Sequence, residues 1–140
     1  MRDALEAAVS ARANLAGANL AGANLAGAYL AGAYLAGANL AGANLADANL
    51  AGAKWRNGIT LTRAPLQLFG LAYTVNILDA HMQIGCELHA LSEWREFDDA
   101  RIVQMDGKTA LKFWRAHKAA LLALAESDGR GVVAAAQEAA

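Results

Sequence analysis

Residues 13–52 read ANLAG-ANLAG-ANLAG-AYLAG-AYLAG-ANLAG-ANLAD-ANLAG, a phrase of five residues that is written eight times. A leucine stands at every fifth position, from Leu15 to Leu50. A short fixed period of this kind is typical of architectures in which similar units stack on one another. This stretch therefore decides the fold of the first part of the chain.

A period of five fits neither an α-helix nor a flat β-strand. On a helix, successive leucines would advance by about 140° around the axis and would form no single apolar face. On a strand, an odd period would send them alternately to the two sides. All the leucines can lie inside only if the chain turns a corner once in each unit. Glycine ends seven of the eight units and suits such corners, because it adopts a positive φ without a steric clash.

These units resemble the repeats of the pentapeptide-repeat family, which read Ala-Asp/Asn-Leu-x-x. The resemblance implies a right-handed, quadrilateral parallel β-helix with four units in each coil, so that the chain has about two coils. It also implies that the central leucine and the alanine two residues before it point inward, while the other three positions face outward. The implied structural core consists of Leu15, Leu20, Leu25, Leu30, Leu35, Leu40, Leu45, Leu50 and Trp55.

The end of the repeat is marked by a tryptophan. A coil of four units stacks Leu15 on Leu35 and Leu35 on Trp55. An indole ring is too large for a position shaped for leucine, so the regular coil is expected to end there. Asn57-Gly58 follows as a strong turn signal. The β-helix is accordingly assigned to residues 13–58.

Two caps are expected to flank the coils, because the open end of a stacked repeat exposes its core. Residues 1–12 are predicted to form a short N-terminal helical cap, since Asp3 and Glu6 match a variant of the capping box. Residues 59–128 are predicted to form an α+β C-terminal cap with two or three strands, followed by helices. Residues 129–140 are an alanine-rich tail that frays or extends the last helix.

Local sequence signals divide the predicted C-terminal cap into strands and helices. A β-rich stretch at 66–78 bends at Gly70, and a further strand is expected at 81–85. Short helices are expected near Ser92 and from residue 98 or 99 to about Met105. Residues 108–126 are the clearest helix, because its apolar residues fall on one face. That face comprises Ala110, Phe113, Trp114, His117, Leu121 and Leu124.

A second resemblance concerns this C-terminal half. The motif Ile84-Gly85-Cys86-x-x-His89, then Trp94 and Phe113-Trp114, is similar to the C-terminal cap of pentapeptide-repeat proteins from phages and prophages. It implies a bacterial or phage origin, and no functional residue is transferred from it.

Composition narrows the classes of function. The chain has 140 residues, a formal net charge of −1 and one cysteine. A nearly neutral chain has no overall attraction to nucleic acid or anionic lipid. No signal core or apolar run of membrane-spanning length is seen, and a single cysteine cannot form an internal disulfide. We therefore expect a cytoplasmic protein with no membrane contact.

The only metal candidates are weak. Cys86 and His89 have a C-x-x-H spacing, and His81 lies nearby. A structural zinc site needs four protein ligands, so His117 would also be required. The alternative is that Cys86 is a buried free cysteine, which behaves as a small hydrophobic residue. The sequence predicts no metal and no cofactor.

Two surfaces are candidates for interaction. Tyr29 and Tyr34 replace the outward asparagine in successive units, and exposed aromatics on a rigid surface suit partner binding. The alternative is that a cap folds over them. Lys108, Lys112 and Arg115 follow one side of the last helix and suit phosphate or an acidic partner. The alternative there is an ordinary solvated face, partly paired with nearby aspartates.

The sequence shows no phosphate loop, no paired carboxylates in a pocket-forming pattern and no specific metal motif, so we expect no enzyme. The prediction is a non-catalytic scaffold that binds a protein partner, as a phage or prophage accessory protein, with possible stacking of copies through the coil ends. One alternative is a DNA mimic that binds gyrase, as the best-understood family members do. DNA mimicry needs about one negative charge per 1.7 Å, whereas residues 13–53 contain only Asp47. The other alternative is a small protein that contacts a metal or nucleic acid through its C-terminal region, although nucleic-acid binding is not expected.

Overall fold

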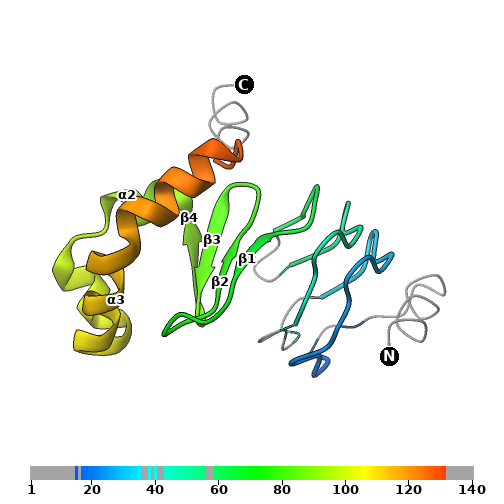
Figure 1. The fold of residues 1–140 in the computed structure, drawn as a ribbon, viewed down its shortest axis with the longest axis horizontal. Helices are drawn as coiled ribbons and strands as arrows, with labels where there is room; N and C mark the ends of the chain where they lie inside the picture. The colour runs from blue at the N-terminus through cyan, green and yellow to red at the C-terminus, as the bar shows by residue number, and fades with distance from the viewer. Residues whose placement is uncertain are drawn as a thin grey trace. The chain divides into compact units, whose positions relative to one another are not determined.

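The structure is a computed structural model that describes residues 15, 17–35, 38, 40, 43–55 and 59–131 (Figure 1). The chain divides into two compact units, Met1–Phe69 and Gly70–Ala140. The predicted N-terminal cap at residues 1–12 and the tail from residue 132 lie outside the described residues.

The first unit turns a corner in each pentapeptide. The amide N–H of Ala28 donates to the carbonyl of Leu25 at 3.0 Å, and Gly27 between them has a φ of 72°. An i to i+3 hydrogen bond with positive φ at the third residue is the pattern of a type II turn, which favours glycine. Asp47 occupies the glycine position of its unit with a φ of 58°, and the same bond forms from Ala48 to Leu45. The corner geometry is therefore kept even where the glycine is replaced.

Successive coils stack in parallel with a spacing of twenty residues. Parallel bridges join Asn24 to Asn44, Tyr29 to Asn49, and Tyr34 to Lys54. In one of these ladders Leu25 N–H donates to the carbonyl of Asn44, and Asn44 N–H donates to that of Ala23. Twenty residues are four pentapeptides, so each coil has four sides. This arrangement is a parallel β-helix of short bridges rather than of long strands.

The interior contains the leucines and the alanines two residues before them. Leu25, Leu45 and Leu50 are fully buried, Leu20, Leu30 and Leu35 nearly so, and Leu15 and Leu40 are half-buried. The inward alanines at 23, 28, 33, 43, 48 and 53 are also buried. Trp55 is buried as well, and Lys54 beside it still bridges Tyr34, so the indole occupies the leucine position of one further side. The expectation that an indole could not fit this position was therefore wrong.

The chain reverses after Trp55 and covers the edge of the last coil. Trp55 N–H donates to the carbonyl of Ile59, Leu61 N–H donates to that of Ala53, and Lys54 and Thr60 form an antiparallel bridge. The predicted Asn57-Gly58 turn itself lies outside the described residues. Leu61 is fully buried. This returning segment pairs backbone groups that would otherwise form an open sheet edge.

The Gln67 side chain covers the opposite side of the coil, at Ala43 and Leu45. The side-chain amide of Gln67, in strand β1 (Leu66–Leu68), donates from Nε2 to the carbonyl of Ala43 and accepts at Oε1 from Leu45 N–H, both at 2.8 Å. In the ladder one coil earlier, the Asn44 backbone makes these two bonds to Ala23 and Leu25. The side-chain amide of Gln67 thus makes the two hydrogen bonds that a backbone peptide group of a further coil would make.

The second unit contains three antiparallel strands, β2 (Val75–Ile77), β3 (His81–Ile84) and β4 (Glu87–Ala90). The register pairs Val75 with Ile84, and Met82 with His89. The sequence predicted a strand at 81–85 but missed β4. With β1, the predicted cap segment 59–128 holds four strands instead of two or three.

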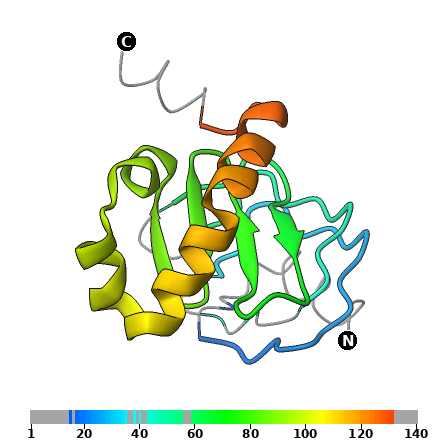
Figure 2. The same cartoon turned by 60° about the vertical axis from the view of Figure 1, so that its left-hand side comes forward.

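Two helices, α2 (Leu91–Glu96) and α3 (Asp99–Ser127), cover one face of these strands, and α3 crosses that face obliquely (Figures 1 and 2). Asp106 and Gly107 are not helical and kink α3, so it consists of the two predicted helices joined end to end. The helix ends in a Schellman motif: Gly129, with a φ of 72°, donates to Glu126, and Arg130 donates to Ala125. The expected apolar face is correct except at its end, because Leu124 is exposed and Ala125 is buried instead.

Candidate functional site

The most exposed aromatic side chains of the coils are Tyr29 and Tyr34, with exposed fractions of 54 % and 52 %. They lie on successive sides of the coil, and we call this pair the tyrosine surface. The backbone beneath is held by Leu30 N–H, which donates to Asn49, and Leu35 N–H, which donates to Lys54, each at 2.8 Å. Two large side chains thus project from a backbone that is hydrogen-bonded to the neighbouring coil.

The asparagines that normally occupy this position have a local structural role. In Asn24, Asn44 and Asn49, Oδ1 accepts from the backbone N–H two residues later, at 3.0–3.2 Å, and Asn19 does the same. Each side chain supports the corner of its own unit, as in an Asx turn. A tyrosine cannot make this bond, so positions 29 and 34 lose a corner contact and gain an exposed ring.

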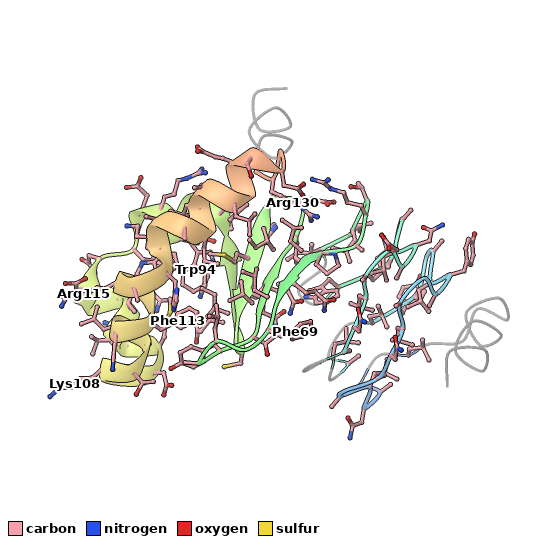
Figure 3. The ribbon with its side chains drawn as sticks, viewed as in Figure 1. Phe69, Trp94, Lys108, Phe113, Arg115 and Arg130 are labelled. Atoms are coloured by element: carbon pink, nitrogen blue, oxygen red, sulfur yellow. The ribbon has the colours of Figure 1, made fainter. Side chains whose placement is uncertain are left out.

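The basic side of α3 is partly neutralised. Arg115 forms an ion pair with Asp99, and Lys118 Nζ donates to the carbonyl of Arg95 at 3.3 Å. Lys108 and Lys112 are exposed. Figure 3 shows Lys108 and Arg115 pointing away from the strands, whereas Trp94 and Phe113 lie between the strands and α3. Lys108 and Lys112 alone provide little positive charge for a surface that would bind phosphate groups.

The weak metal candidates are not brought together. His81 pairs with Ala90 and Met82 with His89, so the two histidines lie on opposite faces of the sheet. Cys86 lies in the β3–β4 turn and is exposed, so the alternative of a buried cysteine was wrong. His89 Nε2 contacts Glu87 Oε1 at 2.8 Å. Among the described residues, no group of three His, Cys, Asp or Glu side chains is placed to hold a metal ion.

Burial lowers the pKa of His81, while Glu93 acts in the opposite direction. The imidazole of His81 is therefore neutral at pH 7.

Arg130 is a buried charge that sequence analysis missed. It is only 3 % exposed, and its guanidinium donates to the carbonyl of Ile77 and to Asp128 Oδ2, both at 2.9 Å. Asp79 Oδ1 lies 4.0 Å away. These contacts tie the end of α3 to the end of β2 (Figure 3). Arg130 thus has a structural role. The sequence indicated only that it follows Gly129, the residue expected just past the end of the helix.

A cavity of about 250 Å³ lies in the second unit, beside the kink of α3. Its walls come from the β3–β4 turn, α2, both parts of α3 and Tyr73. The cavity is lined by residues of the C-terminal motif singled out in the sequence, namely Ile84, Gly85, Cys86, Trp94, Phe113 and Trp114. The motif did not indicate a cavity, because its segments are far apart in the sequence and meet only in the fold.

The geometry of the first unit defines a class of protein: a four-sided parallel β-helix built from five-residue units. A comparison with family models agrees, because the model described as "Pentapeptide repeats" matches residues 11–45 in eight copies. Residues 11–45 are therefore pentapeptide repeats. No curated protein and no solved structure matches the chain significantly.

Among the described helices, none combines the length and the apolar character that crossing a bilayer requires.

Proposed function

We propose that the chain is a non-catalytic scaffold whose right-handed, four-sided coil presents the tyrosine surface to a protein partner. The observation that carries this proposal is the exchange at positions 29 and 34. A local hydrogen bond of the corner is lost there, and the ring that replaces it remains more than half exposed. Because the rings bury little apolar surface, their packing against the coil adds too little stability to compensate for the lost hydrogen bond.

Tyrosine suits such a role on physical grounds. It offers a large contact area with few rotatable bonds, so that little conformational entropy is lost on binding. The backbone ladders beneath it reduce that loss further, because a rigid surface needs no reordering. The neighbouring alanine and glycine residues are small and leave both rings exposed.

The alternatives have less support. The described coil residues carry only Asp47 and Lys54 as charged side chains, whereas a duplex carries about one charge per 1.7 Å. Stacking of copies on the C-terminal end of the coils is disfavoured, because the returning segment at 59–61 and Gln67 already pair with that edge. A role as an accessory protein of a phage or bacterium rests only on the sequence motif at 84–114.

The double variant Tyr29→Asn/Tyr34→Asn tests the proposal. It restores the repeat consensus and two Asx bonds, so the Tm should stay the same or rise slightly. Recovery of partners by affinity purification from the native host should fall at least about tenfold, as expected when interface hot spots are lost. Crosslinking mass spectrometry should place the lost contacts on the coils.

The matched control is Lys108→Ala/Lys112→Ala, which alters the other candidate surface. It should leave partner recovery unchanged. The proposal fails if the tyrosine variant retains every partner, or if the lysine variant alone loses them.

A further inference from the structure

The cavity of the second unit owes its space to the kink in α3. Gly107 has a φ of 62°, and Asp106 before it is also outside the helical region. Ile102 and Met105 therefore precede the break, while Ala110 and Phe113 follow it, and all four line the same cavity. A continuous helix would place these residues on one straight face, whereas the kink lets the two parts enclose a space.

The walls are aromatic and held in place. The rings of Trp94 and Trp114 lie 5.0 Å apart, and those of Tyr73 and Phe113 meet edge to face at 5.1 Å. Trp94 Nε1 donates to the carbonyl of Met82 at 2.8 Å, which fixes the indole on the sheet. The cavity is thus a preformed aromatic recess, as small-molecule sites usually are.

The charged groups of the cavity have one sign. The described residues that line it include the carboxylates of Asp106 and Glu87 and contain no lysine or arginine. Glu87 is already paired with His89, whereas Asp106 accepts from the Tyr73 hydroxyl at 2.6 Å and remains exposed. An apolar aromatic recess with a carboxylate at its edge is complementary to a ligand with an apolar body and a positive end, which aromatic faces also attract.

We infer that this cavity binds a small organic ammonium compound, with its apolar body between the aromatic walls and its ammonium group at Asp106. The size agrees with this class of ligand. An engineered cavity of about 150 Å³ accepts benzene, so one of about 250 Å³ has room for a single ring with a short amine chain. The inference is independent of the tyrosine surface, which lies in the first unit.

The test uses 2-phenylethylamine as the probe and the full chain. Trp94 and Trp114 both line the cavity, so tryptophan emission should change with probe concentration and saturate, and calorimetry should report the same Kd. The anionic analogue 3-phenylpropionate should bind at least about tenfold more weakly, because it places like charges together. Equal affinity for the two compounds, or no saturable change with the amine, would overturn the inference.

Three variants locate the site. Asp106→Asn keeps an acceptor for the Tyr73 hydroxyl but removes the charge, and should weaken amine binding by about threefold to tenfold, the range for a partly exposed ion pair. Glu126→Gln removes an exposed carboxylate elsewhere on α3 and should leave binding unchanged. Ala110→Leu fills the cavity and should abolish binding of the amine. Unaltered binding in either Asp106→Asn or Ala110→Leu would contradict the inference.

Discussion

The two units obtain a buried core by different means. In the coils, one leucine position recurs, and six of its eight copies are buried because the ladder repeats every twenty residues. In the second unit, the core combines aliphatic side chains with a cluster of unlike rings, in which Trp94 contacts His89, Phe97 and Trp114. In the first unit, the role of a residue follows from its position within the five-residue repeat. In the second unit it follows from partners that are distant in the sequence.

The largest expected effect concerns the stacked core. Leu35 is 3 % exposed, so Leu35→Ala should lower the free energy of unfolding by about 2–5 kcal/mol, and Leu35→Asp should prevent folding. Urea denaturation followed by circular dichroism measures the difference.

Leu124→Ala serves as the control in the other unit, because Leu124 is exposed, and it should cost less than about 1 kcal/mol. Equal losses in the two alanine variants would refute the assignment of Leu35 to the interior.

The next effect concerns the closure of the coil by Gln67. Gln67→Ala leaves the backbone groups of Ala43 and Leu45 without this partner, and should cost about 1–3 kcal/mol. Gln104→Ala, on the exposed side of α3, is the matched control and should be nearly neutral. Thermal melts of the two variants decide the matter. A Gln67 variant as stable as the Gln104 variant would mean that the edge needs no closure.

A smaller effect is expected at the corners. Gly52 has a φ of 75° with only ordinary contacts around an added Cβ, so Gly52→Ala should cost about 1–2 kcal/mol through backbone strain alone. Asp47→Gly, at the equivalent corner, should not destabilise, since Asp47 already has a φ of 58°. Chemical denaturation of both variants tests this. A loss of stability in the glycine variant would show that the Asp47 side chain has a role beyond the corner.

The smallest effect belongs to the second unit and depends on pH. The hydrogen bond to Asp106, with a contribution from burial, raises the pKa of Tyr73 from 10.0 to about 12. Because the folded pKa is the higher one, the stabilisation is complete below pH 10 and is lost as the pH rises from 10 to 12. Absorbance at the phenolate band should show a late ionisation, which Tyr73→Phe removes and Asp106→Asn moves toward 10.0. An unchanged titration in the Phe variant would rule out this assignment.

Much of the repeat was predictable because its physics is local. The five-residue period required corners, and both glycine and Asp47 form them. The helices of the second unit were also visible, including the interruption at Asp106-Gly107, because their apolar spacing and breakers are local signals. The match to pentapeptide repeats at residues 11–45 agrees with the motif on which the first prediction rested.

The remaining features required the fold itself. Nothing near Gln67 in the sequence shows that its side chain will replace a peptide group beside Ala43, because the two segments meet only after the chain has reversed. The same is true of Arg130 on the carbonyl of Ile77 and of the cavity beside the kink. The period, the corners and the inward leucines could be read from the sequence, since they depend on the five-residue unit itself. The closure of the coils and the position of the aromatic recess could not, since those contacts join residues that no local pattern relates.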